Sequence, residues 1–257
     1  MATPGRSSAT RDWPHPVTGV WKTGVVASVH GETPSARSLE IDIAGWPGNI
    51  AGQHLDLRLT APDGYTATRS YSIASSGPGE RVQLAVDRLP DGEVSPYLVD
   101  DVMVGDELEL RGPLGGWFIW KPEQPEPVQL IAGGSGVVPL VAMVRAHRAA
   151  KSSAKFRLLY SVRTPRDVFF ADELAALQKE AANLDITWVY TRETPVGWPT
   201  QAGRVTRDLL EASTIPVAEH PTVFVCGPTG FVESVADILV DLGHEPAHVK
   251  TERFGGK

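Results

Sequence analysis

Two glycine-rich turns hold the residues best suited to chemistry in this sequence. "GGSGVVP" (residues 133–139) and "VFVCGPTG" (residues 223–230) each begin in or directly follow an apolar segment. Glycines let a phosphate-bearing ligand approach the backbone, and the start of a following helix offers unpaired N–H groups to its negative charge. In the first turn, Pro139 stands where the dinucleotide fingerprint has its third glycine. The turn therefore predicts either a phosphate site or a tight connection.

Cys226 lies in the second turn and is the only cysteine of the sequence. A single thiol cannot form an internal disulfide, and it cannot supply the thiolates of an iron–sulfur cluster. Two interpretations stay open for it. It is a small buried apolar residue, as free cysteines usually are, or it lies at the same sheet edge as the first turn.

A third segment, "RSYSIAS" (residues 69–75), alternates like a half-buried strand. Tyr71 and Ile73 would face one way, and Ser70 and Ser72 the other. The segment nevertheless begins with a permanent cation and carries several hydroxyl groups. A strand of this composition raises the question of a polar ligand.

The elements that must position these residues differ between the two halves of the chain. Before residue 120, short segments with period-two alternation end near Gly, Pro, Asn, Asp or Ser, which predicts an antiparallel barrel or sandwich. They cover residues 21–31, 36–45, 53–62, 69–76, 81–90 and 106–115. We expect a tail over 1–17, a barrel domain over 18–120, a Pro-rich linker over 121–128 and a second domain over 129–257.

The second domain alternates strands with helices, which predicts a parallel sheet with helices on both faces. Helices are expected over 139–150, 170–184, 205–213 and 230–243, and strands over 128–134, 156–162, 186–192, 222–227 and 248–254. Pro139 is expected to open the first helix, and Gly243 to end the last one.

Composition narrows the class of function. The 257 residues have a hydrophobic content of 42% and a formal net charge of −7. An acidic chain is unsuited to a nucleic-acid-binding surface as its main function. No segment reads as a membrane span, and the first 17 residues lack the apolar block of a secretion signal. We therefore expect a cytoplasmic protein.

Further motifs extend the pattern along the chain: "AGQHLDL" (51–57), "VDRLPDGEVSPYL" (86–98), "RGPLGGWF" (111–118) and the terminal "TERFG" (251–255). In this order, together with the segments above, they resemble the ferredoxin–NADP reductase superfamily, in its bacterial branch of flavin-dependent reductases without an iron–sulfur domain. The resemblance implies a barrel that binds FAD and an α/β domain that binds NADPH, with NADH as the alternative.

The resemblance also implies roles for single residues. Arg69 would pair with the FAD pyrophosphate, because its guanidinium matches phosphate oxygens. Tyr71 would pack against the flavin, and Ser72 would offer its hydroxyl to flavin N5. His54 is either a site residue or a packing residue. The residues expected to contact FAD are Arg69, Ser70, Tyr71, Ser72, Val86, Asp87, Arg88, Gly92, Glu93, Val94, Ser95 and Phe254.

For the dinucleotide, the resemblance places the pyrophosphate on the first glycine-rich turn and the nicotinamide near Cys226. The residues expected to contact it are Gly134, Ser135, Gly136, Ser161, Arg163, Thr191, Arg192, Arg204, Cys226, Gly227 and Pro228. Ser72, Cys226 and Glu252 are the expected catalytic residues, and no metal site is expected.

The implied function is an FAD-dependent reductase that takes hydride from NAD(P)H and passes electrons to a separate protein, such as a ferredoxin, a flavodoxin or an oxygenase component. Two alternatives stay open: a reductase of small acceptors such as free flavin or ferric chelates, and a non-redox binding module on the same scaffold.

Overall fold

The first sheet is antiparallel and closes into a barrel. The structure, a computed structural model, describes residues 19–180 and 183–255, so the tail expected over 1–17 lies outside it. The strands are β1 (Lys22–Thr33), β2 (Ala36–Ile43), β3 (His54–Thr60), β4 (Thr66–Ser72), β5 (Arg81–Asp87) and β6 (Glu107–Leu114). Their order is β4-β3-β6-β1-β2-β5, and a bridge between Ile73 and Leu84 joins the two outer ends.

Period-two alternation explains the barrel core. Leu39, Ile41 and Ile43 of β2 point inward with none of their surface exposed, and Leu55 and Leu57 of β3 do the same. Residues between them on each strand face outward, as the pleat of a strand requires. A short π-helical segment, η1 (Tyr97–Asp101), follows β5 along the chain and packs Leu98 into this core.

The second sheet is parallel, in the order β11-β10-β7-β8-β9. Its strands are β7 (Val128–Gly133), β8 (Phe156–Val162), β9 (Leu184–Tyr190), β10 (Thr222–Pro228) and β11 (Val249–Phe254). The helices are α1 (Val137–Ala149), α2 (Ala171–Glu180), α3 (Arg207–Ser213) and α4 (Thr229–Asp241). The predicted fold class, a barrel followed by a parallel α/β sheet, is confirmed.

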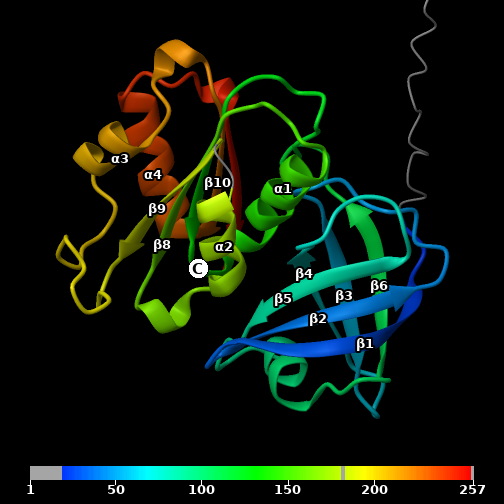
Figure 1. Ribbon diagram of the computed structural model, residues 1–257. Helices are drawn as coiled ribbons and strands as arrows, with labels where there is room; N and C mark the ends of the chain where they lie inside the picture. Colours follow the sequence, from blue (N-terminus) through cyan, green and yellow to red (C-terminus); the bar gives the residue numbers. More distant parts are fainter. Residues whose placement is uncertain (1–18, 181–182, 256–257) are drawn as a thin grey trace, which may run out of the picture.

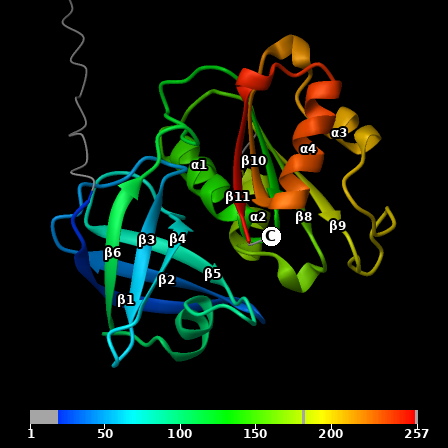
Figure 2. The same ribbon diagram turned by 180° about the vertical axis from the view of Figure 1, so that it is seen from behind.

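Helices cover both faces of the parallel sheet. α1 and α2 pack on the face that carries Leu130 and Leu158, whereas α3 and α4 pack on the face that carries Ile131 and Leu159. In both ribbon views α1 lies between this sheet and the barrel (Figures 1 and 2). None of the helices in the described residues is long and apolar enough to cross a membrane.

Some predicted element ends were wrong. α1 begins at Val137, and Pro139 lies inside its first turn, because residues Gly134–Gly136 already form a 3₁₀ turn that leads into the helix. The helix expected to run to residue 184 is described only to Glu180, and Leu184 opens β9. Gly243, two residues after the end of α4, has φ +95°, as its predicted role at the helix end requires.

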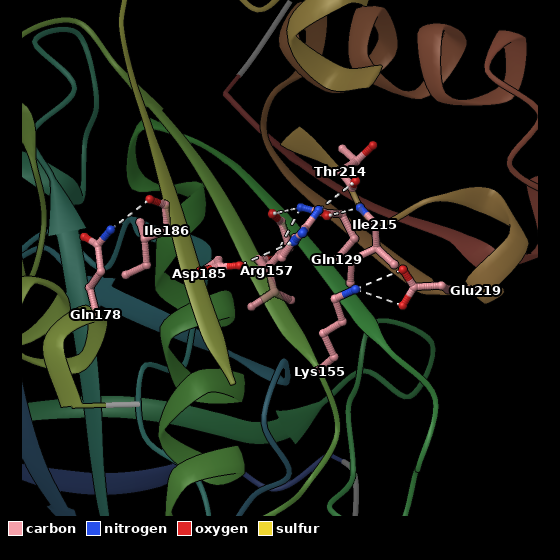
Figure 3. A network of polar contacts seen from close by, with 10 residues as sticks. Gln129, Lys155, Arg157, Gln178, Asp185, Ile186, Thr214, Ile215 and Glu219 are labelled. Carbon is pink, nitrogen blue, oxygen red and sulfur yellow. Dashed lines mark hydrogen bonds and ion pairs between the residues drawn. The ribbon is translucent and has the colours of Figure 1, made fainter. Parts of the chain in front are cut away.

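A polar network holds together the amino ends of the parallel strands, opposite the glycine-rich turns (Figure 3). The buried Gln129 side chain accepts the Ile215 N–H at 2.9 Å and donates to the Arg157 carbonyl at 3.3 Å. Arg157 in turn donates to the Thr214 carbonyl at 3.1 Å. These bonds satisfy backbone polar groups of the loop after α3. The network lies at the amino ends of the strands, so the carboxyl ends remain the open edge of the sheet.

Candidate functional site

A cavity of about 330 Å³ lies where the carboxyl ends of the parallel strands meet the barrel. This is the place where open α/β sheets bind ligands. Thr33, Ser35 and Asp87 form its barrel wall. The remaining lining residues come from the α/β unit: Gly133, Gly134, Ser135, Ser161, Val162, Arg163, Asp167, Phe169, Thr191, Pro228, Phe231 and Phe254. Eight residues expected at a cofactor are therefore in one cavity: Asp87, Gly134, Ser135, Ser161, Arg163, Thr191, Pro228 and Phe254.

The first glycine-rich turn packs closely against β10 and Phe231 because Gly133 and Gly136 have no side chains. A Cβ on Gly136 would lie 2.2 Å from the Cys226 carbonyl oxygen, and one on Gly133 would lie 2.7 Å from the Phe231 ring. Gly134 has φ +55°, a conformation that glycine adopts without the cost of a Cβ. The turn thus forms a smooth backbone surface at the start of α1.

The three residues expected to be catalytic are linked through His54, across the boundary between barrel and α/β unit. Ser72 is the cross-strand partner of His54 in the β3–β4 pair. His54 Nδ1 lies 3.7 Å from Glu252 Oε1, and Glu252 is paired in register with Cys226 between β11 and β10. Four strands therefore link Ser72, His54, Glu252 and Cys226 through two register pairs and one side-chain contact.

On the barrel, Arg69 and Glu93 are in contact. Arg69 Nη2 donates to Glu93 Oε2 at 2.8 Å, and about half of each side chain is exposed. Tyr65 donates its hydroxyl to the same carboxylate at 2.9 Å. Since Arg69 and Glu93 were both expected at FAD, the structure brings the two expected FAD segments side by side.

Neighbours of Arg69 on β4 point in different directions. Tyr71 packs on the barrel core, and burial raises the pKa of its hydroxyl. Ser70 faces the other side of the strand, where its hydroxyl donates to Asp56 Oδ1 at 2.6 Å. Asp56 also accepts from Arg111, and these hydrogen bonds outweigh its partial burial and lower the pKa of its carboxyl.

The second barrel segment is organised by its own hydrogen bonds. Ser95 Oγ accepts the Leu89 N–H at 3.0 Å, and a Cβ on Gly92 would lie 2.9 Å from that oxygen. Val94 and Val86 are in the barrel core. The charged residues before the turn already have partners: Arg88 donates to Asp100 at 2.6 Å, and Asp87 accepts from Ser35 at 2.8 Å.

The backbones of three arginines lie near Thr191, which lines the cavity. Arg163 lines the cavity, and its carbonyl accepts the Arg192 N–H at 2.9 Å, so the two residues are neighbours. Arg204 follows Gly203, whose N–H donates to the Tyr190 carbonyl, next to Thr191. All three arginine side chains are exposed. Arg192, Arg204, Gly136, Cys226 and Gly227 lie outside the cavity wall itself.

Sequence reasoning missed several residues of the cavity wall. Thr33 and Ser35 lie at the β1–β2 turn of the barrel, and Phe169 and Phe231 lie in segments of the α/β unit. No motif marks the two barrel residues, because they reach the cavity only through the packing of barrel against α/β unit. Phe231 had one indirect signal, since glycines at 133 and 227 leave room for its ring.

Comparison with known proteins identifies the family of this chain. Residues 46–119 match the oxidoreductase FAD-binding domain family, and residues 130–237 match the oxidoreductase NAD-binding domain family. Ferredoxin–NADP reductase B of Sorangium cellulosum is 33% identical over 240 residues, which cover 89% of this chain and 96% of that one. The chain belongs to the ferredoxin–NADP reductase superfamily. It is thus an oxidoreductase family member with an FAD-binding and a NAD-binding domain.

Similar proteins of this family include a larger relative and a solved structure of similar length. The glycine betaine monooxygenase reductase subunit of Chromohalobacter salexigens is 32% identical over 208 residues, 79% of this chain but only 55% of that one, so the chain spans about half of that relative's length. Among solved structures, the FAD/NAD-binding domain of a Vibrio cholerae nitric oxide dioxygenase has a TM-score of 0.80 at 27% identity, covering 91% and 99% of the two chains.

The residues present suit the two cofactors of the ferredoxin–NADP reductase superfamily. Glu252 Oε2 is buried and, among the described residues, has no hydrogen-bond partner. A buried acceptor of this kind calls for a partner from outside the chain. The glycine cradle at Gly134–Gly136 and the cavity beside it suit a pyrophosphate and the sugar groups attached to it. The described residues contain no group of three or more His, Cys, Asp or Glu that could hold a metal ion.

Burial sets the charge state of this cluster. It raises the pKa of Glu252 to about 7. Burial, and the nearby Glu252 carboxylate, raise the pKa of the Cys226 thiol well above its ordinary value. Burial lowers the pKa of His54, although Asp56 partly opposes this. These shifts favour the neutral thiol and the neutral imidazole, and near pH 7 the protonated and ionised forms of Glu252 are both populated.

Proposed function

We propose that this chain is an NAD(P)H-dependent flavin reductase component that hands electrons to a separate acceptor protein. The carrying observation is the contact between His54 and Glu252 where the FAD-binding and NAD-binding domains meet, with Ser72 paired to His54 and Cys226 paired to Glu252 in the strand register. When bound together, the nicotinamide would supply a hydride and the flavin would accept it and release electrons onward. The protein's own contribution is to bind both cofactors, bring their rings together and keep water out.

Each side chain has a defined task in this proposal. Arg69 and the backbone of residues 92–95 hold the FAD pyrophosphate, and Tyr71 packs beside the flavin. Gly134–Gly136 hold the dinucleotide pyrophosphate. Ser72 donates a hydrogen bond to the flavin, and Glu252, with its pKa near 7, holds or releases a proton beside it.

The names of relatives support a protein acceptor. One relative is called a reductase subunit of a monooxygenase, and another a ferredoxin–NADP reductase. An oxygenase component or a ferredoxin is therefore the acceptor class that we propose for this chain.

NADPH is the proposed hydride donor. The arginines at 163, 192 and 204 lie around Thr191, and guanidinium groups with a hydroxyl are good partners for a 2′-phosphate. Asp167 also lines the cavity in this region, and its Oδ1 lies 3.9 Å from Arg163 Nη2. It leaves Arg192 and Arg204 to the ligand.

Anaerobic spectroscopy followed by acceptor assays tests the proposal. The purified protein should be yellow and should bleach on addition of NADPH. Electron delivery should be fast with a ferredoxin or an oxygenase component, and slow with free FMN or ferric citrate. Fast turnover with the small acceptors alone would favour the small-molecule reductase. A colourless protein that does not retain added FAD would favour a non-redox binding module.

A further inference from the structure

One hydrogen bond joins the barrel to the α/β unit at the edge of the cavity. Glu32 of β1 accepts the backbone N–H of Phe170 at 2.9 Å through Oε2. Phe170 has φ +53°, a left-handed conformation that is unfavourable for a residue with a side chain. A carboxylate from the other unit therefore holds a strained residue directly before α2.

Arg145 of α1 makes a second, denser junction beside it. Its Nη1 donates to the Ala74 carbonyl at 2.9 Å and to Gln83 Oε1 at 2.6 Å, both on the barrel. Its Nε and Nη2 donate to Glu173 of α2 at 2.8 and 2.6 Å. The guanidinium also lies 4.8 Å from the centroid of the Phe170 ring. One side chain thus joins α1, α2 and the barrel. In Figure 1, α1 lies on the side of the parallel sheet that faces the barrel.

The Glu32–Phe170 junction is connected to the cavity by the chain itself. Thr33 follows Glu32 and lines the cavity from the barrel, and Phe169 precedes Phe170 and lines it from the α/β unit. The Glu32–Phe170 hydrogen bond therefore connects the two opposing walls within one residue of each. If this bond is lost, the walls are free to change their separation.

We propose that Glu32 and Arg145 are positioning residues that set the separation of the FAD-binding and NAD-binding domains for hydride transfer. The inference rests on the proposed function above. Neither residue needs to touch a cofactor, since each acts through Phe170 and the packing of α1 and α2. Effective proximity falls steeply with small displacements of reacting groups, so a looser junction should slow the transfer step more than it weakens binding.

Stopped-flow reduction of bound FAD by NADPH provides the first test. Glu32→Ala should lower the limiting reduction rate on the order of tenfold or more, with an unchanged FAD spectrum and little change in the dissociation constant for NADPH. Glu32→Gln retains an acceptor oxygen and should recover most of the rate. Glu219→Ala is the matched control, because Glu219 is a partly exposed carboxylate paired with Lys155 within the α/β unit. It should behave like the unmodified protein.

Arg145→Lys keeps the charge but loses the forked donors, and it should also lower the limiting rate. Its control is Arg157→Lys, which alters an arginine bonded only within the α/β unit among its described contacts. Wild-type reduction rates in both Glu32→Ala and Arg145→Lys would overturn the proposal.

Amide hydrogen exchange gives a readout that needs no cofactor. The peptide containing residues 169–171 should exchange faster in Glu32→Ala than in wild type or Glu219→Ala, and unchanged exchange would overturn the role of the hydrogen bond. If Glu32→Ala does not fold, Arg145→Lys decides the outcome by the limiting reduction rate, and a wild-type rate in that variant would overturn the proposal. Failure of the wild-type protein to reduce bound FAD would instead refute the proposed function and would be visible before any variant is compared.

Discussion

Arg69 already has a carboxylate partner, and this affects how strongly it can hold an anion. Its ion pair with Glu93 is half exposed, so solvent screens it, and a pyrophosphate carrying more charge can compete for the guanidinium. Arg69→Ala should weaken FAD binding by about 1.5–3 kcal/mol, the value of a charge-assisted hydrogen bond. Flavin retained after extensive dialysis is the measurement. Arg81→Ala, which removes another exposed barrel ion pair, should leave it unchanged. Full flavin occupancy in the Arg69 variant would contradict the assigned role.

Glu252 should make the stability of the cofactor-free protein depend on pH. Its folded pKa is about 7 against an ordinary value of 4.5, because burial disfavours the carboxylate. The folded state thus binds the proton more tightly than the unfolded state. Stability from this group is fully present below about pH 4.5 and is lost as the pH rises through about 7.

Glu252→Gln stays neutral at every pH, so it should gain stability relative to wild type as the pH rises from about 4.5 to 7. The gain should approach roughly 3 kcal/mol above pH 7. Urea unfolding at a series of pH values measures it, with the exposed Glu211→Gln as control. A difference between Glu252→Gln and wild type that does not change with pH would contradict the raised pKa.

Arg192 tests the choice of dinucleotide. Arg192→Ala should lower kcat/KM for NADPH about ten- to hundredfold, because a charge-assisted contact to the 2′-phosphate is lost. The value for NADH should hardly change. Steady-state kinetics with both nucleotides measures this, and Arg207→Ala, on α3, serves as control. Equal use of the two nucleotides by the unmodified protein would argue against an NADPH site.

Among the elements, the glycine-rich turn and β10 are in very close contact. Gly136→Ala would place a Cβ 2.2 Å from the Cys226 carbonyl oxygen, a backbone atom that cannot move aside alone. The start of α1 must shift away from β10, which should cost about 1–3 kcal/mol of stability and weaken dinucleotide binding. Urea midpoints and NADP⁺ titrations measure the two effects. Gly203→Ala has no atom within 4 Å of the new Cβ and should match wild type in both.

Local patterns explain why the elements themselves were predictable. Period-two burial of Leu39, Ile41 and Ile43 in β2, and the change to alternating strands and helices after residue 128, are properties of neighbouring residues. The start of α1 was less predictable, because the Gly134–Gly136 turn already continues into the helix and Pro139 is tolerated within its first turn. Propensity alone does not distinguish a proline that opens a helix from one two residues inside it.

The site was predictable only where a motif marks the backbone. The glycine-rich turn, and the residues after β8 and β9, lie in the cavity as parallel-sheet topology requires. Thr33, Ser35 and the Glu32–Phe170 hydrogen bond depend on how two separate sheets pack, which no local pattern encodes. The pairing of Arg69 with Glu93, 24 residues apart, likewise follows from barrel closure.

For the whole molecule, the core under α1 is continuous with the barrel. Ala51, Ala74 and Ala85 of the barrel share a buried cluster with α1, and the Trp120 ring lies 5.0 Å from the Phe156 ring in a T-shaped pair. Trp120 also donates its backbone N–H to the Ala51 carbonyl. The two sheets should therefore unfold together, since neither can expose this layer without loss.

Trp120→Ala should lower the free energy of unfolding by about 3–5 kcal/mol, the usual cost of removing a large buried aromatic. Urea unfolding followed by far-UV circular dichroism and by tryptophan fluorescence should give one coincident transition in the wild type. Trp117→Ala removes a tryptophan that is 60% exposed and should have little effect. Two separate transitions in the unmodified protein would show that the sheets are independent.

The burial of Cys226 has a practical consequence. Cys226 is the only thiol in the sequence, is 1% exposed and has a raised pKa. It is therefore a poor target for alkylating reagents while β10 stays packed in the sheet. Reaction with iodoacetamide then reports the opening of the sheet edge beneath the cavity. The rate of carboxamidomethylation, followed by intact mass, would measure how often this part of the sheet opens. No label needs to be introduced into the protein.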